Sequence, residues 1–152
     1  MQLKFSKSKK VKSPLKAHDT DAGIDFFVPE DFESLELYPG DDVNIQSGIR
    51  MEVPPGYALV FFNKSGICTN EQLIVGACVV DEGYQGEVHL HMINVGSLPV
   101  YIKPNQKIVQ GLLVCVPTVK VEEVSNDDLF SFPTKRGEGG FGSTNQEKEL
   151  DS

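Results

Sequence analysis

The sequence predicts an all-β fold, either a sandwich or a barrel, and two observations support this expectation. Short runs rich in β-branched and aromatic residues recur along the chain, and turns containing proline, glycine, asparagine or aspartate separate them. Such spacing is typical of domains built from many short strands. Signals for helix are few, because only residues 69–72 suggest a cap, and they suggest a single short turn.

The expected strands follow one another in chain order. Residues 26–28 end before a proline, and residues 35–37 lead into a Pro-Gly-Asp turn. Residues 43–53 alternate loosely between apolar and polar side chains and end at a Pro-Pro-Gly turn. The remaining expected strands are 57–62, 73–80, 87–95, 100–103, 108–116 and 119–124.

Two of these runs, 73–80 and 108–116, are apolar without clear alternation, which indicates burial of both strand faces. They are either central strands of the chain's own core or part of a subunit interface, and the pattern favours neither. The length of 152 residues fits one domain with a real core. We expect a β domain over residues 1–125 and a flexible C-terminal arm over residues 126–152.

The composition, 39% hydrophobic and 24% charged, is that of a globular protein, and the formal net charge is −8. That charge argues against nucleic acid as a partner, despite the lysines of residues 1–16. No apolar run is long enough to cross a bilayer, and no secretory signal is evident, so we expect no membrane partner. The expected location is the cytoplasm, or the host-cell cytoplasm if the protein is viral. The three cysteines are too widely spaced to suggest a disulfide framework or a zinc knuckle.

A glycine-rich motif near the C-terminus combines groups suited to a phosphorylated ligand that carries a ring. It runs from Arg136 to Thr144 and includes four glycines and Phe141. Glycines let backbone N–H groups approach phosphate oxygens, arginine offers a planar fork, and phenylalanine offers a stacking face. A dinucleotide fingerprint would need a strand before it and a helix after it, and the Walker A pattern is also absent. We interpret the motif as a lid over a site formed elsewhere, rather than as a linker.

Two further segments carry candidate groups for catalysis or phosphate binding. Lys64, Ser65 and Gly66 follow an apolar run and are either a phosphate grip or an ordinary exposed turn. Asp81 and Tyr84 belong to an expected hairpin turn, in which Asp81 could serve as a general base and Tyr84 as a platform.

Acidic and histidine residues raise the question of a metal. Asp19, Asp21 and Asp25 form either an aspartate-rich turn or a carboxylate wall that orients hydrated Mg²⁺, but not an EF-hand loop. His89 and His91 project to one face of an expected strand without a third ligand in register, so two partly exposed histidines are the favoured interpretation.

Together these segments resemble the trimeric dUTP pyrophosphatases, the dUTPase family. The similarity consists of five motifs in the family's order between residues 21 and 144. They are residues 21–25, 63–66, 76–86, 105–110 and 136–144. The third motif is specific, and the fifth is close to the family consensus, whereas the fourth is degenerate.

The resemblance implies a distorted jelly-roll protomer of the β-clip type and a homotrimer whose active sites are shared between subunits. It also implies Mg²⁺-dependent hydrolysis of dUTP to dUMP and pyrophosphate, which lowers dUTP and supplies dUMP for thymidylate synthesis. Asp81 would deprotonate the water that attacks the α-phosphorus, and Tyr84 would pack under the deoxyribose. Main chain at Val79 and Val80 would read uracil. Asp25 would act on Mg²⁺ indirectly through water, because the substrate phosphates would hold the ion.

The remaining implied contacts involve the phosphates and the lid. Phosphate ligands would come from Lys64, Ser65, Gly66 and Gln110. Arg136 would reach the γ-phosphate, Phe141 would stack on uracil, and Gly142, Ser143 and Thr144 would cradle the terminal phosphate.

Some positions depart from the family pattern. Lys64 and Lys107 stand where arginine is usual, and lysine lacks the bidentate fork of arginine. Asn105-Gln106 replaces the usual turn that begins with glycine, and Cys78 replaces a glycine beside the expected uracil pocket. Two alternatives to dUTP hydrolysis are a dCTP deaminase of the same superfamily and a nucleotide-responsive regulatory protein with weak or no catalysis.

Overall fold

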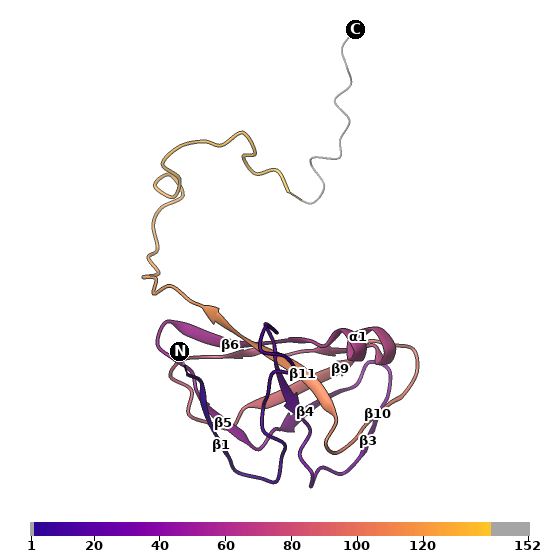
Figure 1. The fold of residues 1–152 in the computed structure, drawn as a ribbon. Coiled ribbons are helices and arrows are strands. Elements are labelled where there is room, and N and C mark those ends of the chain that lie inside the picture. Colours follow the sequence, from indigo (N-terminus) through magenta and orange to yellow (C-terminus); the bar gives the residue numbers. More distant parts are fainter. Residues whose placement is uncertain (1, 141–152) are drawn as a thin grey trace. The chain divides into compact units, whose positions relative to one another are not determined.

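The computed structural model describes residues 2–140, and contacts divide the chain between Thr118 and Val119. All strands and the helix of the described chain belong to the first unit (Figure 1). The arm proposed for residues 126–152 falls within the second unit. In the described part of the chain, no helix is long and apolar enough to span a membrane.

Two antiparallel sheets form the body of the first unit. One has the order β2-β11-β6-β8 and comprises β2 (Ile24–Phe27), β11 (Lys107–Cys115), β6 (Tyr57–Asn63) and β8 (Val79–Val80). The other has the order β4-β9-β7 and comprises β4 (Asp42–Gln46), β9 (His89–Asn94) and β7 (Leu73–Val75). Two smaller pairs complete the unit, β1 (Lys4–Lys7) with β5 (Ile49–Glu52) and β3 (Leu35–Leu37) with β10 (Val100–Ile102).

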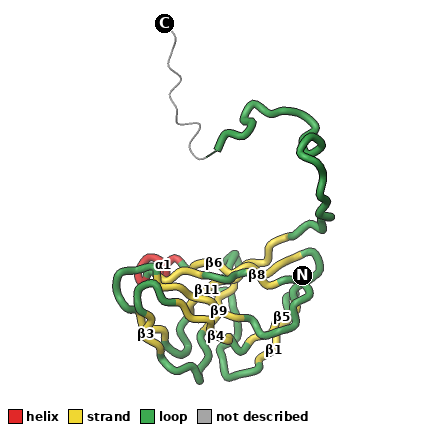
Figure 2. The backbone as a smooth tube through the Cα atoms, turned by 180° about the vertical axis from the view of Figure 1, so that it is seen from behind, coloured by secondary structure: helices red, strands yellow, loops and turns green. Residues whose placement is uncertain are grey.

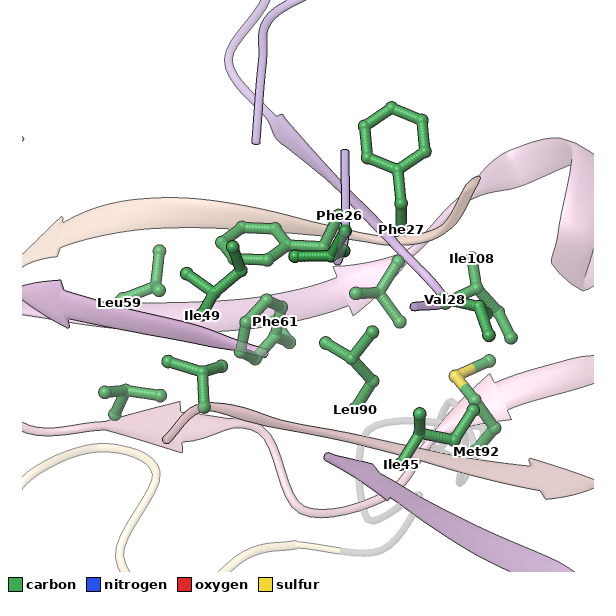
Figure 3. Packing of buried hydrophobic residues seen from close by; sticks show 14 of the residues in the cluster. Phe26, Phe27, Val28, Ile45, Ile49, Leu59, Phe61, Leu90, Met92 and Ile108 are labelled. Carbon is green, nitrogen blue, oxygen red and sulfur yellow. The ribbon is translucent and has the colours of Figure 1, made fainter. Parts of the chain in front are cut away.

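Side chains from both sheets form one buried hydrophobic cluster. Figure 3 shows Phe26, Leu59 and Phe61 of the four-stranded sheet above Ile45, Leu90 and Met92 of the three-stranded sheet. The rings of Phe26 and Phe61 meet edge to face, with centroids 4.9 Å apart. Burying these side chains is the main favourable contribution to folding of a domain of this size.

Strand β9 shows how the core positions polar residues. Its side chains alternate, so that Leu90, Met92 and Asn94 are buried and His89 and His91 lie on the opposite face. This period of two is a direct consequence of the pleat of a strand. The expectation that both histidines share one strand face is therefore confirmed, and they lie outside the core.

A fully buried asparagine secures the end of β9. The Asn94 amide donates to the carbonyl oxygens of Leu37 and Leu98, both at 2.9 Å, and its Oδ1 accepts from the Gly96 N–H at 2.9 Å. These contacts give partners to a backbone carbonyl at the end of β3 and to two backbone groups of the turn before β10. Asn94 thus connects β3, β9 and the turn that precedes β10.

The all-β expectation is confirmed, and the structure corrects several expected elements. The expected strand 43–53 is two strands, because the chain turns at Ser47 and Gly48, where Gly48 has φ +73°. The expected strand 73–80 is interrupted between β7 and β8, which pair in different sheets. Residues 119–124 form no strand.

The segment around Lys64 is also different from the expectation. A seven-residue helix, α1 (Ser65–Glu71), begins directly after β6 and ends at Gln72 in the left-handed region, at φ 53°. Residues 69–72 therefore lie at the end of this helix and do not start a turn of their own.

Replacing Asn94 should destabilise the first unit without altering its apolar core. We expect Asn94→Ala to reduce the free energy of unfolding by about 2–3 kcal/mol, because it leaves buried backbone groups unpaired. Denaturant unfolding measures this value, and Asn44→Ala, on an exposed position of β4, is the matched control. Equal stability of the two variants would contradict the assigned role of Asn94.

Candidate functional site

A cavity of about 190 Å³ lies beside β8, and residues of the third motif form much of its lining. Its lining includes Cys78, Val79, Val80, Asp81 and Tyr84. Within residues 2–140, strand β8 pairs with β6 alone (Figure 2) and is one of the two edge strands of its sheet. An edge strand has a row of backbone N–H and C=O groups on its outer side that are open to a ligand.

The loop that follows β8 positions Asp81 and Tyr84. The Tyr84 N–H donates to the Asp81 carbonyl oxygen at 3.1 Å, which closes a turn, and the Tyr84 hydroxyl donates to the Glu87 carbonyl oxygen at 2.8 Å. A Cβ on Gly86 would lie 2.3 Å from that hydroxyl oxygen, so only glycine leaves room for the ring there. Tyr84 is thereby held in one orientation.

The expectation of a hairpin in this segment is wrong. Strand β8 pairs with β6, whereas β9 pairs with β4 and β7, so the loop carries the chain from one sheet to the other. Glu87 holds the far end of the loop, since its carboxylate accepts from the Gly48 N–H at 2.8 Å and the Ser8 hydroxyl at 2.9 Å. Burial raises the pKa of Glu87, but these two hydrogen bonds and nearby positive charges outweigh burial and leave the pKa below its usual value.

A second group of candidate residues surrounds Asp25 on β2. This carboxylate is buried, and each of its oxygens binds a different ammonium group, Oδ1 that of Lys64 and Oδ2 that of Lys107 at 2.7 Å. Burial raises the pKa of Asp25, but hydrogen bonds from Lys107 and Lys64 and their positive charges outweigh it, so that the pKa lies below its ordinary value of 3.8. Two ammonium groups and one carboxylate give the cluster a formal charge of +1.

Gln110 lies beside this cluster, on β11. Its side-chain amide donates to the Asn63 carbonyl oxygen at 2.8 Å, immediately before Lys64. A Cβ on Gly23 would lie 2.3 Å from the Gln110 Oε1, so glycine at position 23 makes this close approach possible. Helix α1 starts at the same place, where the backbone N–H groups of Ser65 and Gly66 have no acceptor within the helix.

The structure therefore gathers the predicted site residues into two groups. Val79, Val80, Asp81 and Tyr84 line the cavity, whereas Asp25, Lys64, Ser65, Gly66 and Gln110 lie around the end of β6. Val80 pairs with Leu59 of β6, and Lys64 lies five positions after Leu59. Five residues of an extended strand span roughly 17 Å, which separates the two groups along β6. Within one chain, the two groups are adjacent parts of one sheet and not one pocket.

The predicted lid residues lie beyond the first unit. Arg136 is in the second unit, where its Nε donates to the Gly139 carbonyl oxygen at 2.9 Å. Gly137 has φ +49°, a left-handed conformation that favours glycine. Phe141, Gly142, Ser143 and Thr144 lie outside the described residues.

One contact at the cavity was not predicted from the sequence. His91 lies across from the third motif, and its Nδ1 accepts from the Ala77 N–H at 2.8 Å while its Nε2 binds Asp42 at 2.9 Å. The only available signal was the shared strand face of His89 and His91. Within residues 2–140, no group of three or more His, Cys, Asp and Glu side chains is arranged to hold a metal ion.

The ion pairs of Asp25 should make stability depend on pH in acid. Because the pKa of Asp25 is lowered on folding, its contribution is complete above about pH 4 and is lost as the pH falls through the native pKa. We expect Asp25→Asn to cost about 1–3 kcal/mol at neutral pH and to show a flatter loss of stability below pH 4 than the wild type.

Urea unfolding at several pH values measures both effects. Asp19→Asn, at an exposed position of the preceding segment, is the control and should follow the wild-type curve. Parallel curves for Asp25→Asn and the wild type in acid would contradict the assignment.

Comparisons with known proteins identify the family. The dUTPase family model matches residues 9–145. A deoxyuridine 5'-triphosphate nucleotidohydrolase of Gloeothece citriformis is 37% identical over 147 residues, which cover 95% of this chain and 97% of the relative. The enzyme of the same name from Mycobacterium tuberculosis is 34% identical over 135 residues, covering 86% of each chain.

Solved structures share the fold. The dUTPase of Staphylococcus bacteriophage 80alpha, a mutant studied with dUpNHpp, superposes with a TM-score of 0.82 at 22% identity, covering 94% of this chain and 98% of its own. A mutant dUTPase of phage phi11 of S. aureus, with a structural Mg(II) ion, gives a TM-score of 0.73 at 20% identity, covering 83% and 98%. With the family match over most of its length and these relatives, the chain belongs to the dUTPase family.

Proposed function

We propose that this chain hydrolyses dUTP to dUMP and pyrophosphate, which lowers dUTP and supplies dUMP for thymidylate synthesis. The observation that carries the proposal is the exposed carboxylate of Asp81 at the end of an edge strand that lines a cavity. Membership of the dUTPase family and the names of the curated relatives support it.

Uracil would be read by backbone groups of the β8 edge. The base presents an N–H donor between two carbonyl oxygens, and an edge strand offers acceptors and donors in fixed positions. Val80 is buried and Val79 pairs with Val60 of β6, so this part of the backbone is rigid. Cytosine has a different edge pattern and would leave polar groups unpaired, at a cost of about 1–3 kcal/mol for each group.

Tyr84 would form the platform under the deoxyribose. Its ring is fixed by the hydroxyl contact to Glu87 and by the missing side chain of Gly86. A rigid ring in contact with the sugar leaves no room for a 2′-hydroxyl, which would favour deoxyribonucleotides over ribonucleotides.

Asp81 would act as the general base. Its carboxylate accepts a proton from a water molecule, the water oxygen forms a bond to the α-phosphorus, and the bond from that phosphorus to the bridging oxygen breaks. The products are dUMP and pyrophosphate, so atoms and charge balance. The turn to Tyr84 keeps the base at the cavity, which is the positioning that such a reaction requires.

The phosphate chain would bind at the Asp25 cluster and the start of α1. The cluster carries a net positive charge. The ammonium group of Lys64 has three N–H donors, and one of them binds the Asp25 carboxylate. The amide of Gln110 likewise has a second N–H beyond the one bonded to Asn63. Ser65 and Gly66 add backbone N–H groups.

The residues present do not fit direct coordination of Mg²⁺ by Asp25, because both carboxylate oxygens already bind lysine. The dUTPase family generally uses Mg²⁺, and the phi11 relative has a structural Mg(II) ion. We infer that an ion required here would be held by the substrate phosphates, with Asp25 acting only indirectly through water. Bound in that way, the ion would neutralise phosphate charge.

The two separate groups of site residues support a homotrimer with shared sites. On β8 and β11 the single chain leaves Val79 60% exposed and Val114 38% exposed, although both belong to runs that the sequence predicts to be buried on both faces. A second subunit would cover this apolar surface and bring its own residues to the cavity. Arg136, with Phe141, Gly142, Ser143 and Thr144, would close over the site from the arm.

The alternatives are not favoured. The family match and the curated relatives are those of dUTP nucleotidohydrolases, and a deaminase or a purely regulatory nucleotide-binding protein receives no comparable support. A cytoplasmic location, or the host-cell cytoplasm if the protein is viral, stays a prediction.

Substrate choice and the role of Asp81 can be tested in one assay. Pyrophosphate release with dUTP, dCTP, dTTP and UTP should be far faster with dUTP, and Asp81→Asn should lower kcat by roughly 100-fold or more. Glu82→Gln is the matched control, because its amide oxygen can still accept from the Gly56 N–H that Glu82 binds at 2.7 Å. A wild-type protein without dUTP turnover would refute the proposal.

Shared sites can be tested by mixing two inactive variants. One carries Asp81→Asn and the other ends before Arg136, so each lacks a different part of the proposed site. Random mixing in a trimer should restore roughly a quarter of the sites if base and arm come from different subunits. No recovered activity, in mixtures whose mixed trimers are demonstrated by mass spectrometry, would show that one chain builds each site.

A further inference from the structure

The two ring nitrogens of His91 have distinct partners, and these define its tautomer. The Ala77 N–H can only donate, so Nδ1, at 2.8 Å, must be an unprotonated acceptor. The ionised carboxylate of Asp42 can only accept, so Nε2, at 2.9 Å, must carry the proton. His91 therefore sits in this structure as a neutral imidazole with one tautomer selected by its neighbours.

The same residue holds the chain where it leaves β7. The Gly76 N–H donates to the His91 carbonyl oxygen at 2.9 Å, next to the Ala77 contact with the ring. A Cβ on Gly76 would lie 2.2 Å from Nδ1, so the ring lies directly against the backbone of this glycine. Residues 76–78 belong to no strand, and the main-chain and ring contacts of His91 fix the first two of them.

This attachment lies immediately before the edge strand proposed to read uracil. From Ala77 the chain continues through Cys78, whose carbonyl oxygen accepts from the Phe61 N–H at 2.8 Å, into Val79 and Val80. Ala77 and His91 both line the cavity. One end of the base-reading backbone is therefore anchored by β6 and the other by His91.

We propose that neutral His91 is a positioning residue for pyrimidine recognition, and this rests on the proposed function. It acts through the Ala77 N–H, by fixing the main chain that contacts the base, and it does not touch the reacting phosphorus. Protonation of Nδ1 would place two N–H donors opposite each other and would break the hydrogen bond from the Ala77 N–H. Acid should therefore weaken nucleotide binding before it affects the chemical step.

Other titratable groups lie around the ring, and their effects on nucleotide binding must be distinguished from the effect of His91. Asp42 of β4 binds the ring directly, and Asn44, the register partner of His91 on that strand, is neutral. The further titratable groups that line the cavity are Cys78, Asp81, Tyr84, Glu87 and His89. His89 is the most useful comparison, because it lies on the same face of β9.

Three variants separate these contributions. His91→Asn keeps an oxygen near the position of Nδ1 that can accept from Ala77 but cannot titrate, whereas His91→Leu removes the acceptor. His89→Asn removes the other imidazole that lines the same cavity. We expect His91→Leu to raise the KM for dUTP by about threefold to tenfold with a smaller change in kcat, and His91→Asn to restore much of the loss.

The pH profile gives a readout that a merely structural role would not change. Between about pH 5 and pH 8, the range in which imidazoles titrate, the wild type and His89→Asn should both show a KM that rises in acid. This rise should be absent or much smaller in His91→Asn. An acid rise in His91→Asn equal to that of the wild type, or an unchanged KM in His91→Leu, would overturn the inference.

A second measurement does not depend on turnover. The ¹H–¹⁵N resonance of the Ala77 amide should titrate with pH in the wild type and in His89→Asn, but not in His91→Asn. An Ala77 resonance insensitive to pH in the wild type would overturn this inference alone. Absence of dUTP turnover in a wild type whose Ala77 resonance does titrate would instead count against the proposed function.

Discussion

Asp25 is the charged residue among the buried side chains of the described chain, and its charge has to be compensated where it lies. An uncompensated buried carboxylate would cost several kcal/mol, which a domain of marginal stability cannot tolerate. Lys64 at the end of β6 and Lys107 at the start of β11 supply the compensation, one for each oxygen. The requirement to neutralise one carboxylate thus fixes three strands at the place where α1 begins, and it brings the first, second and fourth motifs together.

The strand content could be predicted from the sequence because it depends on local patterns. The sequence predicts a strand over residues 35–37 with the bounds that β3 has, since a short apolar alternation followed by a Pro-Gly-Asp turn leaves little choice. The pairing of strands into sheets depends on partners that are distant in the sequence, so it could not be predicted from local patterns. Val119 and Val121 alternate with polar residues as a strand would, yet they are 72% and 91% exposed, because within residues 2–140 no strand pairs with this segment.

The candidate site divides in the same way between local and distant information. Asp81 and Tyr84 could be named from one short motif, because a carboxylate, a turn and an aromatic side chain are adjacent in the sequence. The contact between His91 and Ala77 depends on the pairing of β7 with β9, which no local pattern encodes. The loop between β8 and β9 crosses from one sheet to the other instead of forming a hairpin, and this too depends on strand pairing that no local pattern encodes. Sheet membership therefore decides what the third motif can contact.

The departures from the expected family pattern at Lys64, before α1, and at Lys107, the first residue of β11, are physically connected. Lys64 and Lys107 replace two arginines, and both bind Asp25. A guanidinium occupies both oxygens of a carboxylate in a planar bidentate pair, whereas two compact ammonium groups can each take one oxygen. Asn105 has φ 63°, and asparagine is one of the few residues other than glycine that adopt this conformation readily. In this chain, a left-handed asparagine therefore forms the turn before β11, and two lysines together neutralise Asp25 where α1 begins.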